Sequence, residues 1–219
     1  MKAMEDVKVH YDGTVRMGSN SIIEFRYGGD GMEATKLERQ KLACIGWDTP
    51  RLQEEMVSRD ADPVTIRQHD RLASLLSRIR DVRMNHFETI DETTLLPFNM
   101  DRMSHRLEHD APVDEQGSHA QYASVLEETL TECRRITKEH RLCCFEAFLL
   151  YYLGAARLKR HASSLRSVRD VCGRIVSKMR FGHVNPGEAV GCIAAQSVGE
   201  PCTQARARHC DAAHGASRT

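Results

Sequence analysis

Apolar residues recur at the helical spacing of three and four positions over much of the second half of the chain. Three such stripes run through residues 122–136, 142–156 and 165–179. Stripes of this kind are typical of helices that pack one face into a core. We therefore expect three helices, with a turn near 160–164. The second stripe is almost wholly apolar and carries only Glu146 as a charge, which favours a buried helix.

Two further helices are predicted earlier in the chain. The Asp-Pro pair at 62–63 is a helix-start signal, because proline fits the first helical turn. Apolar residues at helical spacing follow it over 66–82. The run 96–99 begins a shorter helix, and the polar stretch 108–118 after it is typical of a loop.

The N-terminal part alternates with the two-residue period of β-strands. Apolar and polar positions alternate over residues 7–11 and again over 23–27, with turn residues between them. This pattern predicts an antiparallel hairpin with its tight turn at 17–20, ended by the glycine cluster 28–31. A short helix is predicted over about 33–42. The expected fold class is mainly α with a small N-terminal β-hairpin (α+β).

The composition is that of an ordinary globular protein, with 41% hydrophobic and 28% charged residues and a mean hydropathy of −0.48. No apolar run approaches the roughly 20 residues of a membrane span. The first residues lack the apolar stretch of a secretory signal, so we expect no disulfides. The eight cysteines form no C-x-x-C pair and are expected to be reduced and mostly buried.

The net charge of zero is unevenly distributed along the sequence. Residues 48–132 carry a net charge of −9 and residues 134–180 one of +9. A basic stretch can meet phosphate or an acidic partner, although it can also face solvent or the acidic half of the same chain. The candidate phosphate contacts surround the predicted turn and are Arg157, Lys159, Arg160, Arg166 and Arg169.

Two groups of residues have the side-chain types of metal ligands, and neither is predicted to be a metal site. His105 and His109 are four residues apart, which suits two ligands on one helix face, but no Glu follows His105 and no third ligand is evident. His209, Cys210 and His214 lie in a C-terminal stretch of low complexity, for which a disordered tail is the expectation.

The segment at 189–198, AVGCIAAQSV, combines small residues with two uncharged polar ones. Small residues such as Gly191 allow another backbone to approach closely. Gln196 is expected to bond to backbone or to nucleic acid, because a buried amide needs hydrogen-bond partners. The Gly-Glu-Pro sequence at 199–201 is expected to end the helix.

Three stretches resemble one family in the order in which that family has them. The run NPGEAVGCIAAQSVGEPCTQ at 185–204 resembles the segment that leads into the trigger loop in the largest subunit of multisubunit DNA-directed RNA polymerases. The run MEDVKVHYDGTVRMGSNSIIEFRYGGDGME at 4–33 resembles the hairpin that follows the bridge helix of that subunit. The run LLPFNMDRM at 95–103, with the helices at 120–180, resembles the foot region of the RNA polymerase II type or of related large-DNA-virus enzymes.

The resemblance implies an internal fragment of a larger multidomain subunit, in five segments. Residues 1–47 would form the post-bridge hairpin and a short helix. Residues 48–119 and 120–184 would form the acidic and the basic helical parts of a foot-like region. Residues 185–204 would lead into the trigger loop. Residues 205–219 diverge from the family and are expected to be a disordered tail or the product of a frameshift or truncated gene.

The family makes RNA on a DNA template from ribonucleoside triphosphates with two Mg²⁺ ions. Its magnesium-binding signature, of the form Asn-Ala-Asp-Phe-Asp-Gly-Asp, does not occur in this sequence, and Asp12 and Asp30 lie in glycine turns and do not replace it. The resemblance therefore implies no catalytic residue, no metal site and no cofactor in this fragment, with Mg²⁺ bound in the full subunit. The isolated chain is expected to be inactive.

Site roles are carried over by resemblance to matching positions only. Gln204 matches a glutamine that contacts the sugar of the incoming nucleotide, and an amide suits ribose hydroxyls. The positions that match the base of the trigger loop are Gln196, Glu200 and Thr203. His209 and His214 fall near the place of a family histidine that approaches the nucleotide phosphate, but their surroundings do not match and neither receives that role.

The resemblance also implies partners and a location. The partners would be other RNA polymerase subunits, including the second-largest, with the DNA template and the RNA–DNA hybrid reached through the parent complex and no membrane. The location would be the nucleus, or the host nucleus or cytoplasm for a viral enzyme. Two alternatives stay open: a non-catalytic helical module that binds nucleic acid or an acidic protein through the +9 segment, and a gene remnant.

Overall fold

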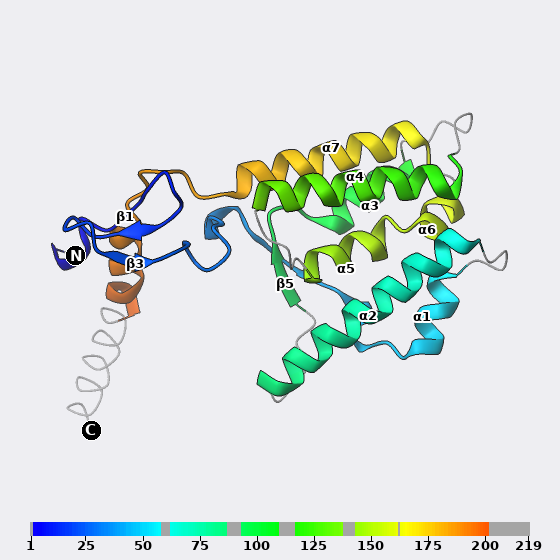
Figure 1. The fold of residues 1–219 in the computed structure, drawn as a ribbon, viewed down its shortest axis with the longest axis horizontal. Coiled ribbons are helices and arrows are strands. Elements are labelled where there is room, and N and C mark those ends of the chain that lie inside the picture. The colour runs from blue at the N-terminus through cyan, green and yellow to red at the C-terminus, as the bar shows by residue number, and fades with distance from the viewer. Residues whose placement is uncertain are drawn as a thin grey trace, which may run out of the picture. The chain divides into compact units, whose positions relative to one another are not determined.

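The chain folds into two compact units joined by two crossings. The computed structural model describes residues 2–57, 62–86, 93–109, 117–137, 143–161 and 163–201. Unit 1 comprises Met1–Glu33 with His183–Thr219, and unit 2 comprises Ala34–Gly182. Helices dominate and the strands are few and short (Figure 1), which confirms the mainly α fold class. None of the described helices is long and apolar enough to cross a bilayer.

Unit 1 contains a small antiparallel sheet in the order β1 (Lys8–Val9), β2 (Val15–Arg16) and β3 (Ile22–Glu24), after a 3-10 turn at Lys2–Met4. The predicted tight turn at 17–20 is confirmed, since the Asn20 N–H donates to the Met17 carbonyl (2.8 Å). The prediction of a two-stranded hairpin is wrong, because the sheet has three strands and β2 lies between the two segments that were predicted to pair. A second turn precedes β2, and it leaves Tyr11 96% exposed.

Unit 2 contains the predicted helices. In the described part of the chain its helices are α1 (Thr49–Met56), which was not predicted, and α2 (Pro63–His86), α3 (Met100–His109), α4 (His119–Thr137), α5 (Cys143–Tyr152), α6 (Ala155–Arg160) and α7 (Leu165–Gly182). The stripe over 142–156 forms two helices, because the backbone is extended at Gly154. The buried Gln68 side chain of α2 then accepts a hydrogen bond from the first N–H of α6, at Ala155 (2.9 Å).

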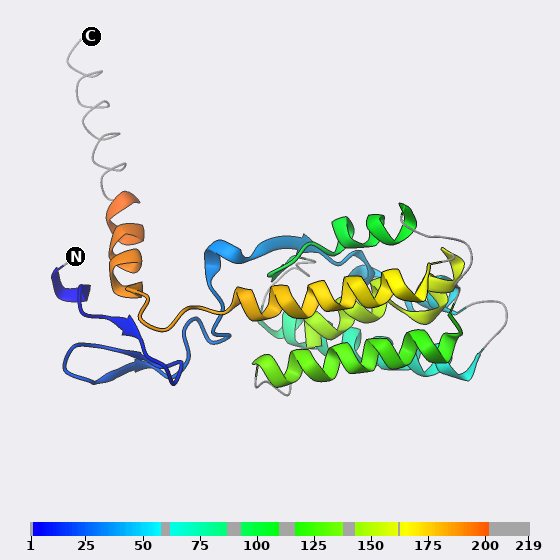
Figure 2. The ribbon, with the colours of Figure 1, turned by 90° about the horizontal axis from the view of Figure 1, so that it is seen from above.

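The core of unit 2 forms where α4 packs along α7, which Figure 2 shows side by side, and where α2 packs along α5. The prediction of a buried helix is confirmed for α5, in which Phe148 and Leu149 are at most 1% exposed. Glu146 is also buried there. Its carboxylate accepts hydrogen bonds from Arg71 of α2 (2.5 Å) and Arg134 of α4 (2.6 Å), so its charge is paired on both oxygens.

A two-stranded antiparallel sheet pairs β4 (Glu38–Lys41) with β5 (Thr93–Leu96). The helix predicted over 33–42 is therefore wrong beyond one 3-10 turn at Ala34–Lys36. The buried side chain of Gln40 gives a reason why these residues form a strand and not a helix. It donates to the Phe98 carbonyl and accepts from the Met100 N–H (2.7 Å), so that β4 is bonded to the first turn of α3.

Candidate functional site

The two terminal stretches that resemble one family are hydrogen-bonded to each other in unit 1. After α7 the chain runs along β1, where the Gly187 N–H donates to the Val9 carbonyl (2.7 Å) and the Val9 N–H donates to the Glu188 carbonyl (3.1 Å). Further along, the Gly191 N–H donates to the Val7 carbonyl (3.1 Å). The main chain of the second stretch is thus bonded along β1 of the first.

The two crossings into unit 2 leave unit 1 side by side. Met32 and His183 form an antiparallel bridge, and the Val184 N–H donates to the Gly31 carbonyl (3.0 Å). The His183 ring nitrogen Nδ1 lies 3.2 Å from the same carbonyl. Unit 1 is therefore closed at the point where unit 2 is inserted.

A cluster of valines forms the hydrophobic core of unit 1. The buried members, each at most 7% exposed, are Val7, Val9, Val15 and Val190, with Tyr27 and Val184 packed against them. Three of the four come from the first stretch and Val190 from the second. The core is thus completed only when both stretches are in place.

Gly191 lies at the closest approach between the two stretches. A Cβ atom built on Gly191 would lie 2.0 Å from the Met4 carbonyl oxygen and 2.6 Å from the Val7 Cβ. Real Cβ atoms do not come so close to other atoms, so the position requires glycine. The predicted close approach of backbone is confirmed here.

Residues 190–201 form a helix, coloured orange in Figure 1, which contains two of the predicted trigger-loop positions, Gln196 and Glu200. The expected helix end at 199–201 is wrong, since the helix passes through all three residues. A glycine costs a helix only about 1 kcal/mol, which explains why Gly199 does not end it. The expected buried amide is also wrong, because Gln196 is exposed, as is Glu200. Thr203, Gln204 and residues 205–219 lie outside the described residues, so their predicted roles stay predictions.

The carboxylates of Asp12 and Asp30 form hydrogen bonds within the turns in which they lie. Asp12 accepts hydrogen bonds from the Thr14 hydroxyl (2.6 Å) and N–H (3.0 Å) and from Arg16 (2.5 Å). Chiefly through the Thr14 bonds, the pKa of the Asp12 carboxyl falls to about 2. The Asp30 carboxylate accepts from the Met32 N–H (2.8 Å). These local bonds stabilise the two turns.

Two of the five candidate phosphate contacts have partners inside unit 2. The Arg157 guanidinium lies over the rings of Tyr151 and Tyr152, 5.1 and 5.2 Å from their centroids. Arg160 donates to the Glu55 carboxylate (3.2 Å) and to the Glu55 carbonyl (2.6 Å). These side chains stabilise the packing of α6, and they would have to leave their partners to reach a phosphate.

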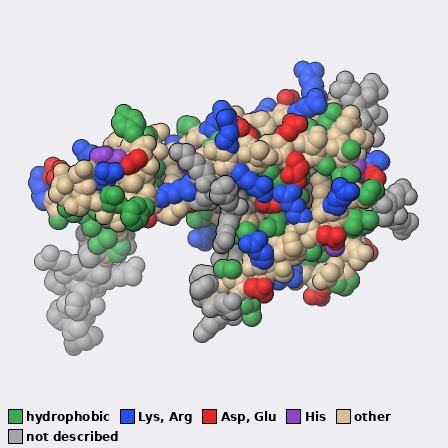
Figure 3. All heavy atoms as spheres, in the orientation of Figure 1, with side chains coloured by type: hydrophobic (Ala, Val, Ile, Leu, Met, Phe, Trp, Pro, Cys, Tyr) green, Lys and Arg blue, Asp and Glu red, His purple; other side chains and the backbone are tan. Residues whose placement is uncertain are grey.

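The other three candidates are available on the surface of unit 2. Lys159, Arg166 and Arg169 are exposed and form no ion pair with the described residues, and the same holds for Arg174 and Lys178 of α7. Figure 3 shows that Lys and Arg side chains on the face of unit 2 in view are interspersed with acidic ones. Within the described part of the chain, four exposed cations of α7 thus have no ion-pair partner: Arg166, Arg169, Arg174 and Lys178.

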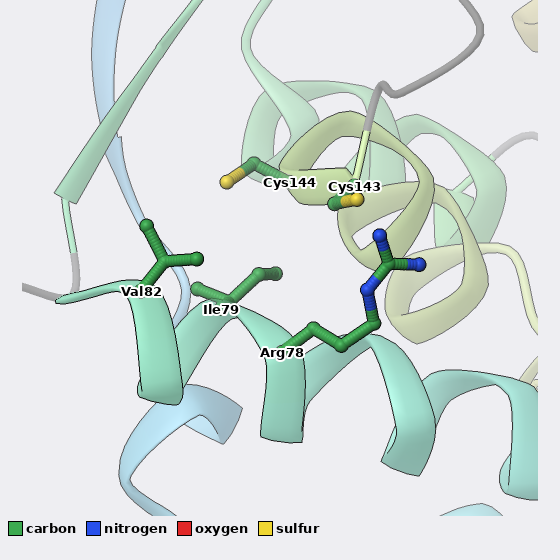
Figure 4. Close-up of a pocket in the computed structure, with 5 residues that line it drawn as sticks. All are labelled: Arg78, Ile79, Val82, Cys143 and Cys144. Atoms are coloured by element: carbon green, nitrogen blue, oxygen red, sulfur yellow. The ribbon is translucent and has the colours of Figure 1, made fainter. Parts of the chain in front are cut away.

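A small pocket lies between α2 and α5 (Figure 4). It has a volume of about 180 Å³ and is lined by Arg78, Ile79, Val82, Cys143 and Cys144. This is below the roughly 300 Å³ of usual ligand sites, so we do not assign it a function. Among the described residues, no three His, Cys, Asp or Glu side chains could hold a metal ion together. The side chain of His109 and the residues at 209–214 lie outside the described residues.

None of the six described cysteines forms a disulfide bond with another described residue, and they differ in environment. Cys44, Cys133 and Cys172 are buried, as predicted, whereas Cys143, Cys144 and Cys192 are half-buried. Burial raises the pKa of the Cys133 thiol to about 12 and also raises that of Cys172. A thiol with a raised pKa is a poor nucleophile, so these two side chains are structural.

Comparison with known proteins covers almost the whole chain. A family model described as RNA polymerase Rpb1, domain 5, matches residues 1–217. The chain is 26% identical over 234 residues to the DNA-directed RNA polymerase III subunit RPC1 of Debaryomyces hansenii. It is 24% identical over 255 residues to the DNA-directed RNA polymerase II subunit RPB1-B of Trypanosoma brucei brucei. Each alignment covers 93% of this chain and 14% of the relative, so the chain spans about one seventh of those proteins.

Proposed function

Because the chain belongs to the RNA polymerase Rpb1, domain 5 family, we propose that it acts as part of the largest subunit of a DNA-directed RNA polymerase. In that subunit it contributes to template-directed RNA synthesis from ribonucleoside triphosphates, a nucleotidyltransferase reaction. The magnesium ions are bound elsewhere in the full subunit. The isolated chain is inactive. The nucleus is the proposed location.

The observation that carries this proposal is the hydrogen bonding of the two family stretches to each other in unit 1. In the proposed function, the stretch along β1 is the fixed root of the mobile trigger loop. Such loops close on substrate and complete the active site. Gln196, Glu200 and Thr203 form the base of the loop, and Gln204 contacts the sugar of the nucleotide. The partners are other polymerase subunits, the second-largest among them, and the template with its RNA–DNA hybrid.

Co-purification and activity test the proposal together. The full-length subunit is tagged, and the complex that it captures is assayed for incorporation of ribonucleotides on a DNA template with Mg²⁺. We expect the second-largest subunit in the complex, activity in the complex and none in the 219-residue chain alone. A tagged subunit that captures no second large polymerase subunit contradicts the proposal.

The cations of α7 that form no ion pair with the described residues favour a second candidate, the direct binding of nucleic acid by unit 2. Phosphate contacts predict an affinity that falls steeply as salt rises. In a filter-binding assay, the pair Arg166→Ala and Arg169→Ala should weaken binding and reduce the salt slope by about 1 for each lost contact. The control is Arg135→Ala, because that guanidinium is paired with Glu132 at 2.9 Å. No binding at low salt removes this candidate.

A further inference from the structure

Gly191 lies in the first turn of the 190–201 helix at a point where no side chain fits. The Cβ of any other residue would lie 2.0 Å from the Met4 carbonyl oxygen and 2.6 Å from the Val7 Cβ. The first of these atoms belongs to the backbone and cannot rotate away. A substitution at Gly191 therefore displaces either the start of the helix or the N-terminal segment.

The first turn of the helix is also the part that is bonded to and packed against the rest of unit 1. The Gly191 N–H is bonded to the Val7 carbonyl (3.1 Å), and the preceding Val190 is only 6% exposed in the valine cluster. Further along, Ile193 is 46% and Val198 65% exposed. Packing in unit 1 thus fixes the start of the helix, while its later turns lie at the surface.

We propose that Gly191 is a positioning residue for the segment that follows the helix. The inference rests on the proposed function, in which that segment carries Gln204 to the nucleotide. With a rise of 1.5 Å per residue, residue 201 is about 15 Å along the helix, so a tilt of about 10° at Gly191 moves it by about 3 Å. A misplacement of about 1 Å can lower an enzymatic rate about 100-fold.

The test compares Gly191→Ala with Gly173→Ala in the assembled polymerase. Gly173 of α7 is the control because it is a helical glycine that receives the same substitution but, unlike the buried Gly191, is exposed, and an added Cβ there meets nothing within 4 Å. We expect Gly191→Ala to assemble normally, to lower kcat for ribonucleotide addition about 10- to 100-fold, and to change KM little. The ratio of kcat/KM for a ribonucleotide to that for its 2′-deoxy analogue should fall, whereas Gly173→Ala should match the wild type.

A structural role alone would reduce the amount of active complex and leave that ratio unchanged, so an unchanged ratio in Gly191→Ala overturns the inference. If this variant does not assemble, Val190→Ala replaces it, because it removes two methyl groups from the valine cluster without adding an atom. A wild-type ratio in Val190→Ala likewise overturns the inference.

Failure of the proposed function is distinguishable from failure of this inference. A wild-type complex that incorporates no ribonucleotide contradicts the proposed function itself. Hydrogen exchange over residues 185–201 in the same complex then tests Gly191 without catalysis. Faster exchange in Gly191→Ala than in Gly173→Ala supports its positioning role, and equal exchange overturns it.

Discussion

Glu146 is a charged side chain inside an apolar helix, and its pairing makes it sensitive to mutation. Removing one partner of a buried ion pair typically costs about 3–5 kcal/mol, because the other charge is left uncompensated. Arg71 and Arg134 are each about one-third exposed and can partly regain water. We therefore expect Glu146→Ala to lower the free energy of unfolding by about 3 kcal/mol, the lower end of that range, measured by urea denaturation.

Glu127 provides the control for this prediction, since it pairs with the same Arg71 but is half-exposed. Exposed ion pairs contribute about 0–1 kcal/mol. Glu127→Ala should therefore change the unfolding free energy by less than about 1 kcal/mol. Equal effects of the two variants would show that the pairing of Glu146 does not matter for stability.

The buried thiol of Cys133 should resist alkylation. With a pKa of about 12, only about one thiol in 10⁴ is ionised at pH 8, and the thiolate is the nucleophile. Burial also blocks the reagent. We expect iodoacetamide to modify the peptide that carries the half-buried Cys143 at least about 100-fold faster, as followed by mass spectrometry. Comparable rates for the two peptides would contradict the burial of Cys133.

At the scale of elements, Gln40 bonds β4 to the start of α3. Gln40→Ala leaves the buried Met100 N–H and Phe98 carbonyl without this side-chain partner, and an unsatisfied buried group costs about 1–3 kcal/mol. We expect a loss of that size in the free energy of unfolding. The neighbouring Arg39 is exposed on the same strand, so Arg39→Ala is the control and should have little effect.

The elements with a local signal were predictable from the sequence, and those without one were not. The apolar stripes predicted α4, α5 and α7, because each helix buries its own stripe. The sequence of β4, Glu-Arg-Gln-Lys, has no apolar alternation, and the strand exists because β5 and Gln40 supply distant partners. The two-residue β2 is too short to leave a pattern.

The candidate site shows the same limit. The close approach of another backbone at Gly191 was predictable, since the lack of a side chain is a property of the residue itself. The bonding of the later stretch along β1 was not predicted, because it joins residues about 180 positions apart. The exposure of Gln196 was misjudged, because which helix face becomes buried depends on those distant partners.

At the scale of the molecule, unit 2 is inserted into unit 1 through two adjacent crossings. Of the buried apolar residues in the described part of the chain, only four belong to unit 1 and all others to unit 2. A unit with its own core can fold alone. We therefore expect residues 34–182, expressed as a separate chain, to unfold in one cooperative transition followed by circular dichroism. A gradual loss of helix without a transition would show that unit 2 depends on unit 1.

The hydrogen bonds between β1 and the later stretch also set an order of events during synthesis. At about 5–20 residues per second, the ribosome needs on the order of 10–40 s to make the residues between Val7 and Gly191. For that time the newly made β1 has no partner for its outer edge, and its valines lack the residue that completes their cluster. Unit 2 can emerge and fold within the same interval. Residues 7–15 are therefore expected to reach their final structure after unit 2, although they are made before it.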